Sequence, residues 1–168
     1  NPISFNNSGV ITASFSNFTL SNDLTIDSLA DPDHSLPDTM RKMLSLEISA
    51  KIQNLALNYL EKENESVLKE VHELIEEARS LNMKFSFGGT GRYFYAKLSD
   101  LIKAVSDVPD ADEVRYITGL ISMADWLHLY INKTALENQA FEIYQRFRQE
   151  PDGELKVLRP MFDWLNFE

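Results

Sequence analysis

The sequence predicts a mainly α protein: an antiparallel bundle of five to six helices, preceded by a short N-terminal β-hairpin or extended arm. Apolar residues recur at helical spacing from about residue 36 onwards. Short polar or proline-containing breaks separate these segments, and short connections favour antiparallel neighbours. Residues 1–33 are instead rich in Ser, Asn and Thr. We therefore divide the chain into an arm, 1–33, and a helical bundle domain, 34–168.

Short strands are predicted in the arm, because apolar and polar residues alternate there in three places. The apolar residues concerned are Ile3 and Phe5, Ala13 and Phe15, and Leu24 and Ile26. An isolated hairpin is only marginally stable in water. We therefore expect the arm to pack on the helical body, with its outer strand edge open to a neighbouring domain or chain.

Each helix has its own start signal or apolar stripe. The first begins near Ser35, a good N-cap residue, with Pro37 in its first turn, and extends to Leu60. The second extends from about Ser66 to Leu81, and its glutamate-rich outer face is typical of a surface helix. The remaining helical segments are predicted at about 91–106, 113–131, 134–147 and 155–165. Pro160 interrupts the last of them.

The periodicity also predicts which side chains are buried. Six inward-facing residues are expected in the core: Leu44, Ile48, Leu74, Leu101, Ile121 and Phe141. The amide pair Asn138 and Gln139 looks buried as well. We expect it to satisfy backbone groups or another helix end, because buried amides are normally hydrogen-bonded.

Composition excludes several function classes. The net charge of −10 disfavours a nucleic-acid partner and an anionic membrane surface, both of which require clustered Lys and Arg. Without cysteine, neither a disulfide framework nor a thiolate metal site can form. No signal peptide and no run of about 18 apolar residues is visible, which favours a cytoplasmic protein without a membrane span.

A glycine cluster is the sharpest local feature, and we treat it as a candidate anion-binding loop. Its residues are Gly88, Gly89, Thr90, Gly91 and Arg92. A glycine loop that leads into a helix can hold an anion on free backbone N–H groups, and Arg92 could add a bidentate contact. The spacing matches neither a P-loop nor a dinucleotide-binding motif. A chain-reversing loop, in which glycine supplies positive φ, is the alternative.

No catalytic motif and no metal-ligand spacing is apparent. The three histidines are His34, His72 and His128, and none lies in a short metal-binding pattern. We therefore predict no metal site and no cofactor. Asp125 and Asp163 lie beside Trp126 and Trp164. Aromatic rings near carboxylates can form a sugar platform or core packing, and we treat Trp126 and Trp164 as a candidate interaction surface.

Helix order and apolar pattern resemble the helical C-terminal region of proteins related to the family 57 glycoside hydrolases, the bacterial α-amylase/α-mannosidase-like proteins. The resemblance covers about residues 36–167 and rests on these stretches: Leu36-Pro37-x-x-Met40-Arg41, 66–83, 93–105 and 114–147. Residues 137–144 are similar to the family's amide-plus-aromatic element with the amide order reversed. Leu165-Asn166-Phe167 is similar to its closing element, with Asn in place of Gly.

The resemblance implies a role beside a catalytic barrel, because the family's catalytic carboxylates belong to that barrel. The expected function is therefore a non-catalytic accessory domain that packs on a carbohydrate-active catalytic domain. A stand-alone protein-interaction module is the alternative, and a small carboxylate-dependent hydrolase is a further one. The expected partners are a neighbouring catalytic domain or another protein, with a homo-oligomer left open.

Overall fold

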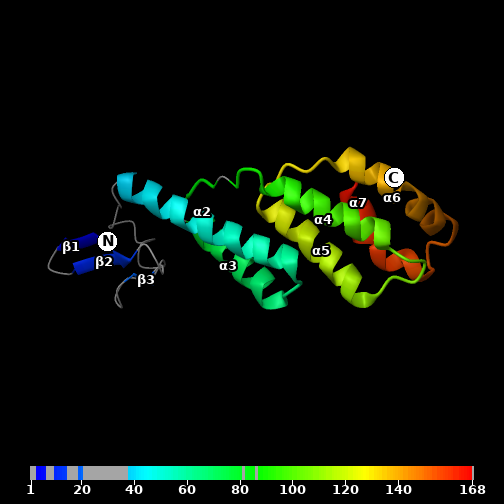
Figure 1. Cartoon of the computed structure of the whole chain (residues 1–168), viewed down its shortest axis with the longest axis horizontal. Coiled ribbons are helices and arrows are strands. Elements are labelled where there is room, and N and C mark those ends of the chain that lie inside the picture. The colour runs from blue at the N-terminus through cyan, green and yellow to red at the C-terminus, as the bar shows by residue number, and fades with distance from the viewer. Residues whose placement is uncertain are drawn as a thin grey trace. The chain divides into compact units, whose positions relative to one another are not determined.

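The computed structural model describes residues 3–6, 10–14, 19–20, 38–80, 82–85 and 87–167. Most of these residues are helical, which confirms the predicted mainly α class (Figure 1). The described part contains six α-helices, α2 to α7, and one 3₁₀ helix, η1. These lie in two compact units: unit 1 comprises residues 1–54 and 73–86, and unit 2 comprises 55–72 and 87–168.

Three short strands are described in the arm. They are β1 (Ile3–Asn6), β2 (Val10–Ser14) and β3 (Thr19–Leu20). They pair antiparallel in the order β1-β2-β3, with Phe5 opposite Ile11 and Ala13 opposite Leu20. Three points of the sequence analysis lie outside the described residues: the predicted helix start at Ser35, the position of His34, and the boundary between residues 33 and 34. Packing of the arm on the helical body stays a prediction.

Unit 1 contains most of α2 (Asp38–Glu61) and the second half of α3 (Glu65–Ser80). Its core consists of aliphatic and methionine side chains: Leu44, Ile48, Ile52, Ile75, Ala78 and Met83. Ser45 Oγ donates a hydrogen bond of 2.5 Å to the carbonyl oxygen of Lys84 and so joins α2 to the segment after α3. The predicted end of the first helix at Leu60 and the predicted bounds of the second, 66–81, are close to the observed ones.

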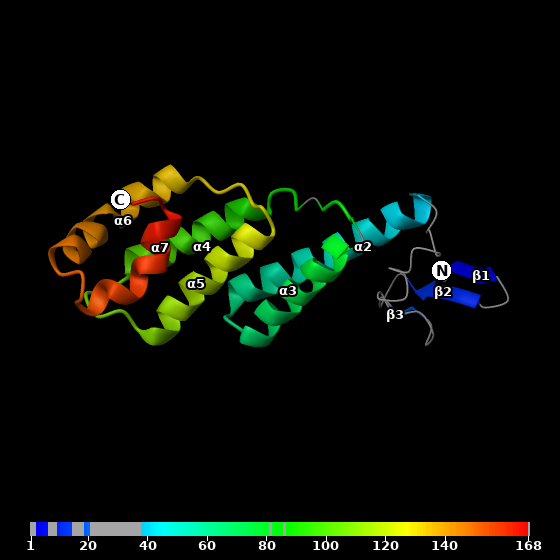
Figure 2. The ribbon, with the colours of Figure 1, turned by 180° about the vertical axis from the view of Figure 1, so that it is seen from behind.

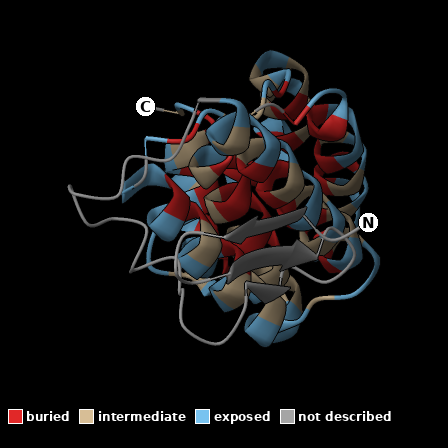
Figure 3. Cartoon of the chain, turned by 90° about the vertical axis from the view of Figure 1, so that its left-hand side faces the viewer, coloured by how far each residue is buried: buried red, intermediate tan, exposed pale blue. Residues whose placement is uncertain are grey.

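Unit 2 is built on α4 (Thr90–Ala104), α5 (Ala111–Trp126) and α6 (Lys133–Gln149). The short η1 (Glu154–Leu158) and α7 (Arg159–Trp164) complete it, with Pro160 in the first turn of α7. Helix α4 packs on α5 and α6, α7 packs on α5, and η1 contacts both α6 and α7 (Figure 2). Figure 3 colours the buried residues of these helices red.

Within the described residues, three helices are followed by a non-glycine residue with positive φ. Asn82 follows α3 (φ 52°), His128 follows α5 (φ 49°) and Asn166 follows α7 (φ 62°). After α5, the N–H of Leu129 donates to Ala124 O and the N–H of His128 donates to Asp125 O. This is a Schellman motif, which satisfies the last carbonyl groups and reverses the chain.

The predicted end of the fourth helix at residue 131 is therefore wrong. Helix α5 ends at Trp126 because the chain turns at His128. The apolar residues that follow continue the helical spacing, and two of them, Leu127 and Ile131, are buried without being helical. These residues are apolar because tertiary contacts bury them, and their spacing happens to match that of a longer helix.

The core prediction is confirmed for Leu44, Ile48 and Ile121. Leu74 and Leu101 are half-buried, which is a weaker outcome than predicted. Phe141 is 51% exposed, so its predicted burial is wrong. The buried face of α6 consists of Leu136, Ala140, Ile143 and Tyr144. Phe141 lies off that face. It follows Leu136 by five residues, and at about 100° per residue its side chain points about 140° away from that of Leu136.

Candidate functional site

The glycine cluster forms the entry into α4. Gly88 has a φ of +47°, the left-handed conformation that favours glycine, and Gly89 is the N-cap residue. Thr90 is fully buried, and its Oγ1 donates a hydrogen bond of 2.5 Å to Phe87 O. The threonine hydroxyl therefore stabilises the turn itself and lies away from solvent.

A surface hollow of about 340 Å³ opens beside this turn, and we call it the Tyr130 hollow. It is lined by Gly88, Gly89, Gly91, Arg92, Tyr95, Tyr130 and Asn132. Four of the five predicted loop residues line it, whereas Thr90 does not. No sequence pattern groups Tyr95, Tyr130 and Asn132 with the loop, since two of them follow α5. Anion binding at this loop stays a prediction.

Gly91 allows the segment after α5 to lie directly on α4. A Cβ atom at Gly91 would lie 2.3 Å from the carbonyl oxygen of Tyr130, a distance that real side chains do not tolerate. Ile131, the next residue, is buried. The backbone is therefore held between a glycine and a buried anchor, while the Tyr130 side chain is 91% exposed.

Arg92 is the single charged residue in the lining of the Tyr130 hollow. Its Nη2 donates a hydrogen bond of 2.9 Å to Tyr93 Oη, and its guanidinium carbon lies 4.8 Å from the centre of the Tyr93 ring. Tyr93 is 48% exposed. The Asn132 Oδ1 accepts the N–H of Ala135 and caps α6, which leaves the amide NH₂ as a donor beside the hollow.

Both predicted interaction tryptophans are half-buried in unit 2. Trp164 Nε1 donates a hydrogen bond of 2.8 Å to Asp125 Oδ1. Lys133 Nζ lies 4.1 Å from the centre of the Trp164 ring and also donates to its carbonyl oxygen. The Trp126 ring lies against His72, with 4.5 Å between ring centres. These contacts hold unit 2 together, and a role of Trp126 and Trp164 in binding stays a prediction.

The amide pair on α6 is not buried as a pair. Asn138 is exposed, whereas the Oε1 atom of Gln139 is buried and accepts no hydrogen bond from any described residue. The predicted burial is therefore wrong for Asn138, and, among the described residues, the Gln139 oxygen lacks the hydrogen bond that was predicted for it. Adjacent helical residues point about 100° apart, so only one of the two can face the core.

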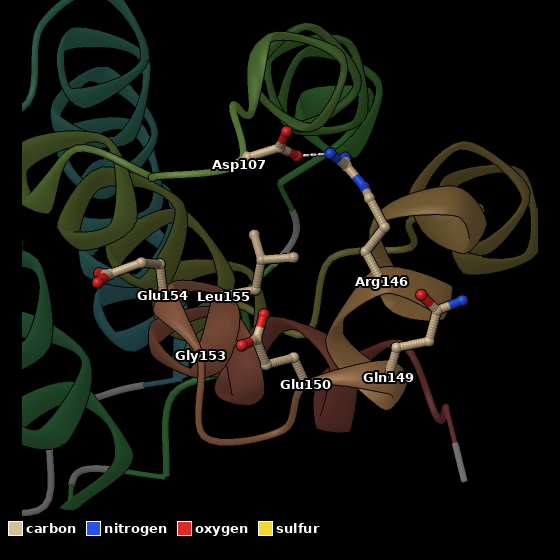
Figure 4. A pocket seen from close by; sticks show the side chains of 7 residues that line it. All are labelled: Asp107, Arg146, Gln149, Glu150, Gly153, Glu154 and Leu155. Atoms are coloured by element: carbon tan, nitrogen blue, oxygen red, sulfur yellow. Dashed lines mark ion pairs between the residues drawn. The ribbon is translucent and has the colours of Figure 1, made fainter.

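A second hollow, of about 350 Å³, lies between the end of α6 and η1 (Figure 4). Arg146 points towards Asp107 and forms an ion pair with it, while Glu150 and Glu154 add carboxylates to the lining. No three His, Cys, Asp or Glu side chains converge as a metal-ligand set in the described part of the chain. Glu76 and Glu77 are exposed on α3.

Two tyrosines with shifted pKa values lie where the end of α2 meets α5. Burial raises the pKa of Tyr59 and of Tyr116 to about 12, and the charge of Glu63 adds to both shifts. The Tyr116 hydroxyl lies 2.7 Å from Leu60 O and 3.0 Å from Tyr59 O, within donating distance of both carbonyl groups. The hydroxyl therefore serves as a structural donor that caps α2, and the raised pKa extends the pH range over which it stays protonated.

No helix in the described residues is both long and apolar enough to cross a membrane. Comparison of the chain with protein-family models, with curated proteins and with solved structures found no match. The resemblance to the family 57 helical domain therefore stays a prediction that rests on helix order and apolar pattern.

Proposed function

We propose that this chain is a non-catalytic accessory domain that binds a neighbouring protein domain through the Tyr130 hollow. A carbohydrate-active catalytic domain is the neighbour that the family resemblance implies. One observation carries the proposal: Tyr130 is almost fully exposed on a backbone segment that is fixed against Gly91. An aromatic side chain on a rigid support loses little conformational freedom on binding.

The residue types around the hollow support a protein partner. Tyrosine and arginine are enriched among the residues that dominate protein–protein binding energy. Tyr95 lines the hollow together with Tyr130 and Arg92, Tyr93 accepts a hydrogen bond from Arg92, and the lining holds no carboxylate. The chain as a whole has a net charge of −10, but the lining of this hollow is aromatic and its one charged residue is the cation Arg92. The complementary surface is a loop that carries an apolar side chain next to a carboxylate for Arg92.

The test uses the protein encoded by the complete reading frame. Any domain outside residues 1–168 is produced separately, and its binding to the 168-residue chain is measured by isothermal titration calorimetry. Tyr130→Ala should weaken binding about 30-fold or more, since truncation of a dominant interface residue costs roughly 2 kcal/mol or more. Phe141→Ala removes another half-exposed ring, on α6, and should leave the affinity unchanged.

Two results would contradict the proposal. The first is an equal loss of affinity in both variants, which would mean that the Tyr130 hollow is not the contact. The second is binding of maltooligosaccharides or mannooligosaccharides to the isolated chain with loss in Tyr130→Ala. That result would assign the hollow to sugar and identify a carbohydrate-binding domain instead of a docking domain.

A further inference from the structure

Helix α2 carries a second apolar face in unit 1. Its inward face buries Leu44, Ile48 and Ile52. On the opposite side, Leu46 is 73% exposed and Met43 is 38% exposed, and Ala50 is exposed as well. An exposed leucine is unremarkable when it stands singly, but these three residues lie on one helix face. A helix with apolar residues on both sides normally contacts a neighbour on both sides.

The spacing of this outer face is that of a coiled coil. Met43, Leu46 and Ala50 are separated by three and four residues, which places them at successive a, d and a positions of a heptad. The following d position is Gln53, which is half-buried. Alternating steps of three and four keep one narrow apolar seam along a helix, and such a seam fits a second helix.

The charges that border the seam identify the partner. Lys42 occupies the g position before Met43, and Glu47 occupies the e position after Leu46. In a parallel pair, a g residue faces the e residue five positions later on the other helix. Lys42 of one copy therefore faces Glu47 of the other, and the symmetry-related pair repeats the contact. An antiparallel pair would set e against e and g against g, so Lys42 and Glu47 would not face each other.

We propose that this face of α2 pairs in parallel with the same face of a second copy of the chain. Residues 38–54 carry three basic side chains and two acidic ones, so two copies of this segment do not repel each other as the strongly acidic chain as a whole would suggest. The other two basic residues are Arg41 and Lys51, and the other acid is Asp38. The proposal goes beyond the proposed function, because it uses no residue of the Tyr130 hollow.

The experiment is sedimentation equilibrium of the full chain over a range of concentrations. The natural chain should form a concentration-dependent dimer. Leu46→Glu should weaken the dimer about 100-fold or more, because it sets two unpaired carboxylates at facing d positions. Lys42→Glu and Glu47→Lys should each weaken it about threefold to tenfold, since two exposed ion pairs become repulsive. The double variant Lys42→Glu with Glu47→Lys should restore the natural affinity.

Val157→Glu is the matched control, because Val157 is a half-exposed aliphatic residue on η1, in unit 2. It should leave the dimer unchanged, and circular dichroism of every variant checks that the helices remain. A chain that stays monomeric at concentrations up to about 1 mM would overturn the proposal. So would a charge-swapped double variant as weak as the single variants. A Leu46→Glu variant that loses stability as a monomer would show that the chain covers this face itself.

Discussion

At the scale of single residues, two glycines permit contacts that a larger residue would prevent. Gly91 admits the backbone of Tyr130, and Gly119 on α5 admits the side chain of Tyr59. Tyr59 is almost fully buried, so its position leaves little room for adjustment. Close packing of this kind makes even one added methyl group costly, because neighbouring atoms must move.

Gly119→Ala should therefore destabilise the protein. The new Cβ atom would lie 2.0 Å from Tyr59 Oη, and overpacking of this kind costs roughly 1–3 kcal/mol. Urea denaturation measures the change. Gly89→Ala is the control, because its Cβ would meet only the Arg92 side chain at 3.4 Å. Adding Tyr59→Phe to Gly119→Ala should recover part of the loss. Equal stabilities of Gly119→Ala and Gly89→Ala would contradict the packing argument.

Alkaline pH should weaken the fold through Tyr59 and Tyr116. Their pKa values are about 12 in the folded chain, above the value of about 10 for an unfolded tyrosine. The folded state thus holds these protons more tightly. Their contribution to stability is complete below about pH 10 and is lost as pH rises through about 12. Urea midpoints measured across this range test the prediction, and Tyr116→Phe should make the decline shallower.

At the scale of elements, the ends of the helices decide where the chain turns. Schellman motifs close α3, α5 and α7, with Asn, His and Asn in the left-handed conformation. After α7, the N–H of Phe167 donates to Phe162 O, and the two rings lie 6.0 Å apart between centres. This hydrophobic contact across the motif is typical of it. Phe167 also stacks on Tyr144 of α6, which ties the end of the chain to the bundle.

Asn166 is the position at which this turn can be tested. Asn166→Ala should lower the free energy of unfolding by about 1 kcal/mol, because a β-carbon is disfavoured in the left-handed conformation and asparagine tolerates it better. Asn166→Gly should be neutral or stabilising, since glycine adopts positive φ without strain. Thermal denaturation of both variants supplies the comparison. A glycine variant less stable than the alanine variant would show that side-chain contacts of Asn166 outweigh the backbone term.

At the scale of the whole molecule, the prediction with the largest consequence is that the arm docks on the helical body. The arm carries many large apolar side chains, too many for a free tail. Among them are Phe5, Phe15, Phe18, Leu20, Leu24 and Ile26. We expect the arm to pack on the helical body. Amide hydrogen exchange of the full chain should show protection throughout 10–28. Exchange as fast as in an unstructured peptide would mean that the arm is ordered only by a partner.

The sequence alone determined the mainly α class and the positions of most helices. Helix α6 begins one residue before the predicted start at 134 and ends two residues after 147. Helices of this length can be predicted from local sequence, because the signals for them are apolar spacing, capping residues and proline, all within a few residues of one another. The sequence also singled out the glycine turn, since glycine clusters reflect a local backbone requirement.

Only the tertiary structure decided which residues share a surface. The Tyr130 hollow requires the carbonyl of Tyr130 to pass over Gly91, and no periodicity links positions so far apart in the chain. The exposure of Phe141 and the early end of α5 were missed for the same reason. The sequence of one helix can be compatible with more than one apolar face. Which face is buried depends on the neighbouring helices that pack against it.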